Sequence, residues 1–438
     1  MKLPSPLIEE LSSEKFDVII VGAGPAGSSA ACSLAAKGLQ VLLLERGKQP
    51  GEKNMFGGRI YPYALRRLLG EEWKQCPIER FVTRENITFM TENSSVTIGF
   101  SRSKLHEDGG FTALRARFDP WLAQKAEEKG ATLLNEVLVT ELFRENGRVA
   151  GVFAGKDEIR ADVVIAADGA TSQLAMKAGL RKEHPPEKVS IGMKEVISLP
   201  RDLIEDRFGL SKDEGSASVY VGYATDGMRG GGFLYTNRDT VSLGLVVGPK
   251  DPVERKVQVH DLVEKFKDHP AVSNLLEDGE VVEYSAHLIP EAGIDTVQRP
   301  YVDGLLLAGD AAGFLLNNAY TFRGVDLSIA SGLAAAETVA KCKEKGDFSA
   351  STLSYYETAL KEHGVTGDLK RFRRVPNYLQ NPRLYSAYPE LLCRIAERVY
   401  TVDGRESKKL MDVMREERKG TVGWLSLFRD LIAGARTF

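Results

Sequence analysis

Residues 16–27 read Phe16-Asp17-Val18-Ile19-Ile20-Val21-Gly22-Ala23-Gly24-Pro25-Ala26-Gly27. The β-branched run that ends at Gly22 is typical of a buried parallel strand. The Ala- and Ser-rich segment from Gly27 to Lys37 has helical spacing and stops at Gly38, and residues 40–45 form a second apolar run. We therefore predict a strand–helix–strand unit over residues 16–45.

The turn between the first strand and the helix has the spacing Gly-x-Gly-x-x-Gly. Gly22 permits a tight turn, Gly24 lets the backbone approach a diphosphate, and Gly27 allows the helix to pack closely on the strand. Glu45, at the end of the second strand, is placed to accept hydrogen bonds from ribose hydroxyls. An ordinary glycine-rich turn is the alternative. The strand before it, the helix after it and the acid at position 45 together indicate a dinucleotide site.

A second motif distinguishes between NAD and FAD as the dinucleotide. The run Leu306-Leu307-Ala308-Gly309-Asp310-Ala311-Ala312-Gly313 places an acid directly after a buried strand. Such an aspartate can bind the ribityl hydroxyls of FAD, whose flavin half must be held well beyond the first unit. NAD dehydrogenases do not need this element. The alternative is that Asp310 caps the N-terminus of a helix, which produces the same pattern and does not exclude a contact with FAD. From this motif we predict FAD as the dinucleotide.

The third motif is Ala166-Ala167-Asp168-Gly169-Ala170. With the other two it resembles the glutathione-reductase-type FAD fold, in the branch of aromatic hydroxylases, geranylgeranyl reductases and electron-transfer-flavoprotein:quinone oxidoreductases. That resemblance implies FAD contacts for Arg46 beside the ribose, Arg115 at the phosphates or flavin, and the Leu138 backbone at the adenine. A plain surface role is the alternative for Arg115.

Two glycine-bearing loops complete the predicted cofactor site. By resemblance, the loop with Gly57 and Gly58 passes beside the flavin ring, where glycine permits close backbone approach. Backbone N–H groups of Gly324 and Val325 can stabilise negative charge on the reduced flavin. Loops without a ligand are the alternative for both. The predicted FAD-binding residues are Gly22, Ala23, Gly24, Pro25, Ala26, Gly27, Glu45, Arg46, Gly57, Gly58, Arg115, Leu138, Ala167, Asp168, Gly169, Gly309, Asp310, Gly324 and Val325.

The middle of the chain differs from its beginning. Period-two stretches such as residues 216–221 and 233–247 predict an antiparallel sheet. The predicted fold class is α/β: a Rossmann-like FAD-binding domain of the glutathione-reductase type, an inserted mixed or antiparallel β-sheet domain and a helical C-terminal region. The predicted boundaries are 14–188 and 291–345 for the two parts of the FAD-binding domain, 189–290 for the quinone or substrate domain, and 346–438 for the helical region.

A narrower resemblance comes from the middle and the end of the chain. Residues 230–237 (Gly-Gly-Gly-Phe-Leu-Tyr-Thr-Asn), 242–248, 284–293 (Tyr-Ser-Ala-His-Leu-Ile-Pro-Glu-Ala-Gly) and 400–404 resemble the FixC family over almost the entire length. FixC proteins are relatives of electron-transfer-flavoprotein:quinone oxidoreductase. The resemblance implies an FAD oxidoreductase that passes electrons from the two-subunit electron-transfer flavoprotein toward a membrane quinone.

The spacing of the cysteines indicates whether this chain can hold an iron–sulfur cluster itself or needs a partner subunit for it. The single-chain quinone oxidoreductases hold an iron–sulfur cluster in a cysteine-rich domain, whereas Cys32, Cys76, Cys342 and Cys393 lie far apart with no C-x-x-C pair. This spacing suits neither a zinc site nor a cluster, and we predict no metal. By resemblance, a separate ferredoxin-like subunit supplies the cluster in a FixABCX-type complex. Such complexes can bifurcate electrons, with the bifurcating flavin in the partner.

The alternative function is an NAD(P)H-dependent flavin reductase of a prenyl or other small molecule. Only one dinucleotide fingerprint occurs, so the chain has no dedicated NAD domain to reduce its flavin. No acid–base cluster is evident, and no catalytic residue is certain. His287 is the one histidine inside a motif and is a weak catalytic candidate; a structural histidine is the alternative.

Charge and the last helix indicate where the protein works. The net charge is −3, which implies no nucleic-acid partner. Residues 361–438 contain 16 Lys and Arg against 10 Asp and Glu. Residues 424–438 place Trp424, Leu427, Phe428, Leu431, Ile432 and Ala435 on one helical face. That face suits a membrane interface, a partner subunit or the protein's own core. No signal peptide or spanning segment is evident, so we predict a cytoplasmic protein peripherally associated with the membrane surface.

Overall fold

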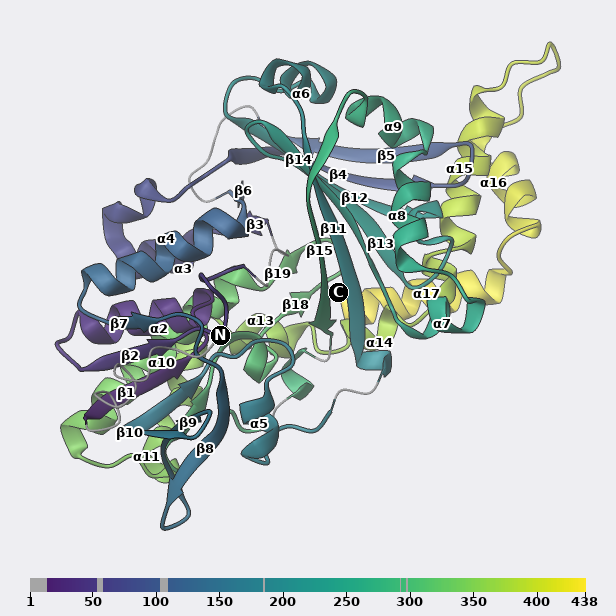
Figure 1. Ribbon diagram of the computed structural model, residues 1–438. Coiled ribbons are helices and arrows are strands. Elements are labelled where there is room, and N and C mark those ends of the chain that lie inside the picture. The colour runs from purple at the N-terminus through teal and green to yellow at the C-terminus, as the bar shows by residue number, and fades with distance from the viewer. Residues whose placement is uncertain (1–13, 53–57, 103–108, 184–185, 292, 297) are drawn as a thin grey trace.

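The computed structural model describes residues 14–52, 58–102, 109–183, 186–291, 293–296 and 298–438. Two large sheets dominate this part of the chain, each with its own apolar core. Helices cover the first sheet on the left of Figure 1, and the second sheet curves across the centre. The C-terminal helices lie at the far end of the second sheet.

The first sheet has the strand order β16-β17-β10-β1-β2-β7, and the β8–β9 hairpin pairs with β10. The neighbouring pairs from β17 to β7 are parallel, and the apolar runs of β17, β10, β1 and β2 are buried on both faces. This confirms the predicted Rossmann-like α/β fold. The strands are β1 (Lys15–Val21), β2 (Val41–Leu44), β7 (Thr132–Leu134), β8 (Val139–Glu145), β9 (Arg148–Ala154), β10 (Asp157–Ala166), β16 (Tyr301–Val302) and β17 (Leu305–Leu307).

Helix α2 (Pro25–Ala35) packs between α10 (Val325–Lys345) and α4 (Arg115–Glu128). Helices α2 and α10 approach each other closely because both carry small residues. A Cβ on Gly332 would lie 2.3 Å from the carbonyl oxygen of Ala26. Helix α4 begins at Arg115. Arg115 is therefore in the first turn of this helix. Short helices α3 (Tyr63–Leu69) and α5 (Gln173–Lys177) complete this part.

The second sheet has nine strands in the order β15-β11-β14-β13-β12-β4-β6-β3, with β5 paired to β4. This sheet includes strands from outside residues 189–290. Strands β3 to β6 come from residues 59–112, which lie within the range assigned above to the FAD-binding domain. It is also mixed, since β12 runs parallel to β4. The strands are β3 (Arg59–Ile60), β4 (Arg80–Met90), β5 (Ser95–Ser101), β6 (Phe111–Thr112), β11 (Val189–Ser198), β12 (Glu214–Gly222), β13 (Gly230–Thr236), β14 (Thr240–Val247) and β15 (Glu280–Pro290).

One face of this sheet is covered by helices. Helix α8 (Val259–Lys267) packs against β11 and β14, and its buried residues Leu262, Val263 and Phe266 join the second core. The opposite face is turned toward the FAD-binding part. The other helices here are α6 (Arg201–Phe208), α7 (Lys250–Arg255) and α9 (Pro270–Leu276).

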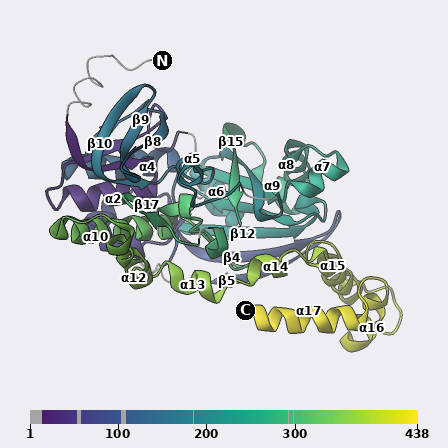
Figure 2. The ribbon, with the colours of Figure 1, turned by 90° about the horizontal axis from the view of Figure 1, so that it is seen from below.

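The C-terminal region is helical, and Figure 2 shows it running along one side of the molecule before it projects beyond the second sheet. Its helices are α11 (Ala350–Leu353), α12 (Tyr355–Glu362), α13 (Thr366–Arg371), α14 (Val375–Tyr378), α15 (Ala387–Tyr400), α16 (Leu410–Lys419) and α17 (Trp424–Thr437). A two-stranded hairpin, β18 (Leu316–Asn317) and β19 (Phe322–Arg323), precedes α10.

Helix α17 is attached by its less apolar side. Asp430 is buried and accepts hydrogen bonds from Arg383 Nε and Nη2 and from the Tyr388 hydroxyl, each at 2.7 Å. The apolar residues Leu425, Phe428 and Leu431 are 88%, 65% and 62% exposed. Of the predicted apolar face, only Leu427 is half-buried, whereas Trp424, Phe428, Leu431, Ile432 and Ala435 are exposed. The apolar stripe therefore faces outward.

Candidate functional site: an FAD-binding edge

The carboxyl ends of four parallel strands meet at one edge of the first sheet. Strands β17, β10, β1 and β2 are consecutive neighbours in the sheet. The residues that follow them are Gly309-Asp310, Ala167-Asp168, Gly22 and Glu45, which are the positions predicted from the three motifs. Ligands of open α/β sheets bind outside the carboxyl ends of the strands. The structure thus brings together motifs that are far apart in the sequence.

The glycine-rich turn has the geometry that its spacing predicts. Gly22 has φ of +104°, and a Cβ there would lie 2.4 Å from the carbonyl oxygen of Ala167. A Cβ on Gly27 would lie 1.9 Å from the carbonyl oxygen of Gly22. A Cβ on Gly24 would meet nothing within 4 Å. Space is therefore open only in front of Gly24, where the unpaired N–H groups of the α2 N-terminus can receive a diphosphate.

Glu45 lies beside this turn. Its Oε2 accepts a hydrogen bond from Ala23 N at 3.0 Å, and its Oε1 accepts one from Gly47 N at 2.7 Å. Each oxygen retains further acceptor capacity for a ribose hydroxyl. Val137 N donates to the Glu45 carbonyl oxygen at 2.8 Å, so the neighbouring Leu138 lies near the ribose position. The Arg46 side chain is exposed at the same corner.

Arg115 is buried behind this edge in an ion pair that the sequence analysis missed. Its Nε and Nη2 donate to the two carboxylate oxygens of Asp119, each at 2.6 Å. The spacing i, i+4 on a helix was the available signal. Burial raises the pKa of Asp310, while the nearby cations Arg115 and Arg181 oppose that rise. Arg115 and Arg181 therefore contribute positive charge around Asp310, and a contact of Arg115 with FAD stays a prediction.

Gly309 and Asp310 form a sharp turn after β17. Gly309 has φ of +61°, and its N–H donates to Ser331 Oγ at 2.9 Å. Ser331 belongs to α10, so this bond joins the motif to the helix that begins at Gly324 and Val325. Gly324 is the N-cap of α10 without a side-chain cap. The first turn of α10 also carries Asp326, whose carboxylate accepts a hydrogen bond from Arg323 Nε at 2.8 Å and lies against the N–H groups of Asp326 and Leu327. Stabilisation of the reduced flavin by Gly324 and Val325 stays a prediction.

The Asp168 carboxylate accepts hydrogen bonds from nearby residues of its own chain segment. Its Oδ1 accepts from Ser172 Oγ at 2.5 Å and its Oδ2 from Leu174 N at 3.2 Å, which holds the start of α5. Its role toward FAD stays a prediction. Gly58 lies between Ala113 and the Tyr235 ring, and Gly57 falls outside the described residues.

His287 lies on β15, across from the edge described above. Burial lowers its pKa, and the neighbouring cations Arg115 and Arg46 lower it further. The ring is therefore neutral at pH 7. Among the described residues His287 Nε2 has no hydrogen-bond partner, so no contact here identifies the ring as a catalytic base.

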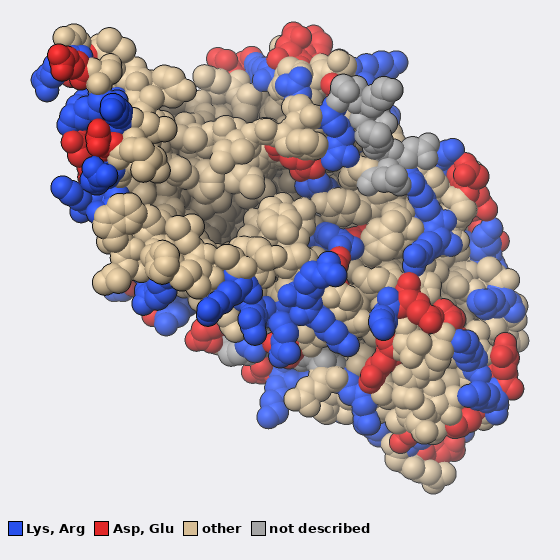
Figure 3. Space-filling view, turned by 180° about the vertical axis from the view of Figure 1, so that it is seen from behind, with Lys and Arg blue, Asp and Glu red and all other residues tan. Residues whose placement is uncertain are grey.

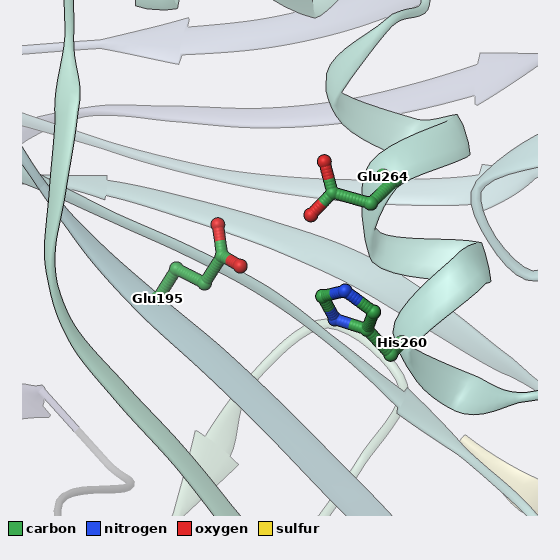
Figure 4. Close-up of side chains that lie close together, drawn as sticks. All are labelled: Glu195, His260 and Glu264. Carbon is green, nitrogen blue, oxygen red and sulfur yellow. The ribbon is translucent and has the colours of Figure 1, made fainter.

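The described residues contain one cluster with potential metal ligands, which Figure 4 shows: Glu195, His260 and Glu264 converge within 4.8 Å. Lys267 Nζ lies 2.9 Å from both carboxylates. The Lys267 ammonium group is shared between the two carboxylates and offsets one of their two negative charges, so the cluster is an ion-pair network on the outer face of the second sheet.

The described residues fit FAD. The open space at Gly24, the acid at Glu45 for the ribose and the acid at Asp310 for the ribityl chain match the order of groups along this cofactor. The family comparison agrees: residues 15–317 match the FAD binding domain family, and residues 375–438 match the ETF-QO/FixC family C-terminal domain. The protein binds FAD.

Relatives align over nearly the whole chain. The probable electron transfer flavoprotein-quinone oxidoreductase YdiS of Escherichia coli (strain K12) is 44% identical over 427 residues, covering 97% of this chain and 99% of that protein. Protein FixC of Azorhizobium caulinodans is 37% identical over 437 residues, with the same coverage. A geranylgeranyl bacteriochlorophyll reductase-like structure from Thermoplasma acidophilum has a TM-score of 0.72 at 21% identity, covering 96% of this chain and 99% of that one. This last likeness concerns the fold.

Proposed function

Because the chain belongs to the ETF-QO/FixC family of FAD oxidoreductases, we propose that it passes electrons from an electron-transfer flavoprotein toward a membrane quinone. The observation that carries this proposal is the 37–44% identity to FixC and YdiS over 97% of the chain. FAD supplies a centre that takes up and releases electrons. The residues of the first sheet bind it, and the second sheet closes the site from the other side.

We also propose that the iron–sulfur cluster of such a system belongs to a separate ferredoxin-like subunit, as in a FixABCX-type complex. Cys32, Cys76, Cys342 and Cys393 are each buried and unpaired. Burial raises the pKa of Cys32 and Cys342 to about 11, which disfavours the thiolate form that ligates metal. If the complex bifurcates electrons, the bifurcating flavin lies in the electron-transfer flavoprotein.

The outward apolar stripe of α17 supports a membrane location for this activity. No described helix is long and apolar enough to cross a bilayer. From behind, Figure 3 shows a hollowed face almost without charged side chains, with both basic and acidic residues around its margin. The exposed apolar residues of α17 and the cations Arg429 and Arg436 belong to the same helix. Interfacial helices bind through this combination of apolar area and positive charge.

Vesicle binding tests the location. Changing Leu425, Phe428 and Leu431 to Gln removes exposed apolar area, and we expect binding to phosphatidylglycerol-containing vesicles to be lost while FAD content is unchanged. The matched control makes the same change at Val281 and Val282 of β15, which are 49% and 60% exposed. We expect this variant to keep vesicle binding. Loss of the ferredoxin-like subunit in place of vesicle binding would show that the stripe docks a protein.

Reduction of the flavin tests the electron-transfer proposal. We expect the purified chain to contain one FAD and no iron, and to remain oxidised with NADH or NADPH alone. Reduced electron-transfer flavoprotein should bleach the flavin absorption, and a soluble quinone should restore it. Rapid reduction by NADPH with formation of a reduced small molecule would favour the prenyl-reductase alternative and overturn the proposal.

A further inference from the structure

A row of polar side chains on the second sheet has no role in the site described so far. In the β11–β15 pair, Lys194 lies opposite Ser285, and Gly192 lies opposite His287. Residues directly opposite in an antiparallel pair point to the same face. Glu195, the next residue on β11, points to the other face, where it bonds Lys267 of α8. Ser285 and His287 therefore face away from α8, toward the FAD-binding part.

Two atoms of this row are buried without a partner. Ser285 Oγ and His287 Nε2 are shielded from solvent, and neither has a hydrogen-bond partner among the described residues. Buried polar atoms in folded proteins are almost always hydrogen-bonded, to protein or to something bound. Gly192 opposite His287 has no side chain that could fill this role. The pair of atoms therefore marks a place where a bound group supplies the partner.

The charges around His287 identify the kind of group. Arg115 and Arg46 both act on the His287 ring, and Arg115 also acts on Lys194. Arg46 follows Glu45 at the ribose position, and Arg115 lies near Asp310 at the ribityl position. In FAD the group between the ribose and the ribityl chain is the diphosphate. The two unpartnered atoms, Ser285 Oγ and His287 Nε2, together with the positive charge of Arg46 and Arg115 acting on the ring, suit an anion such as this diphosphate.

We propose that Ser285 and His287 of β15 donate hydrogen bonds to the diphosphate of FAD, so that the second sheet holds the cofactor together with the first. His287 donates from Nε2, and Ser285 from its hydroxyl. Lys194, paired with Glu283 at 3.4 Å, supports the same strand face from β11. The inference concerns the FAD site alone and is independent of the electron donor and acceptor.

The test uses the full-length protein loaded with FAD. His287→Ala removes the donor, and we expect FAD to dissociate about tenfold faster, the size expected for one hydrogen bond to a charged group. His287→Gln retains an N–H donor and should recover part of the loss. Ser285→Ala, a smaller change, should show the same effect to a lesser degree. His260→Ala alters an exposed histidine on the opposite face and serves as the control.

A spectroscopic measurement separates contact from a structural role. The ³¹P NMR resonances of bound FAD report on the diphosphate, and we expect them to shift in His287→Ala while the visible flavin spectrum is unchanged. A changed flavin spectrum with unchanged ³¹P resonances would place His287 at the flavin ring and overturn the assignment. Reduced thermal stability with unchanged ³¹P resonances and FAD release, in both the His287 and Ser285 variants, would show that the row is only structural.

Discussion

Replacing Asp430 by Ala tests how α17 is held. The change removes the acceptor of two Arg383 hydrogen bonds and one Tyr388 hydrogen bond, each 2.7 Å long. Breaking a fully buried ion pair costs about 3–5 kcal/mol. The Arg383 side chain is 30% exposed and Asp430 only 7%, so water replaces part of the lost interaction, and we expect about 2 kcal/mol. This corresponds to a roughly 30-fold increase in the population of detached α17.

Hydrogen exchange measured by mass spectrometry reads this population directly. Peptides from residues 424–437 should exchange about 30-fold faster in Asp430→Ala, whereas peptides from β1 and α2 should be unchanged. Ala favours helix more than Asp does, so a loss of intrinsic helicity cannot account for faster exchange. Asp412→Ala removes an exposed ion pair with Arg415 on α16 and is the control. Unchanged protection of α17 in Asp430→Ala would refute the view that this carboxylate anchors the helix.

Three further results are expected. Arg383 and Tyr388 hold the pKa of Asp430 well below its usual range; this stabilisation is fully present above the unfolded-state pKa of about 4 and is lost progressively as pH falls toward the lower folded-state pKa. The protection factor of α17, which corrects exchange for its intrinsic pH dependence, should therefore fall in acid in the wild type but not in Asp430→Ala. Gly24→Val should lose FAD but keep its thermal stability without cofactor, because a Cβ there meets nothing, whereas Gly27→Ala should lose both because its Cβ would lie 1.9 Å from the Gly22 carbonyl oxygen; equal melting temperatures of the two variants would contradict this. Asp310→Ala should lower FAD content after purification, and full retention would show that the ribityl chain is held elsewhere.

The parts of the fold that the sequence predicts are those determined locally. The unit at residues 16–45 follows from one apolar period, one turn and one helix. Glu45 lies directly after β2, and Asp310 lies in the turn that follows β17. The entry of β4 and β5 into the second sheet depends on pairing β4 with β12, more than a hundred residues away, and no local pattern specifies that partner. Ser331 was missed because it meets Gly309 only in the folded chain. Asp119 was missed although its i, i+4 spacing from Arg115 is a local signal.

The direction in which the apolar face of α17 points is another feature that the local sequence does not specify. Amphipathic spacing predicts one apolar face but not which way it turns. Asp430 decides this, because its buried bonds to Arg383 and Tyr388 are satisfied only when the opposite face points outward. Such an arrangement leaves large apolar side chains in contact with water, which is unfavourable for the isolated chain. The same carboxylate that anchors the helix therefore keeps these apolar side chains exposed. A lipid surface or partner that covered them, as proposed above, would offset this cost.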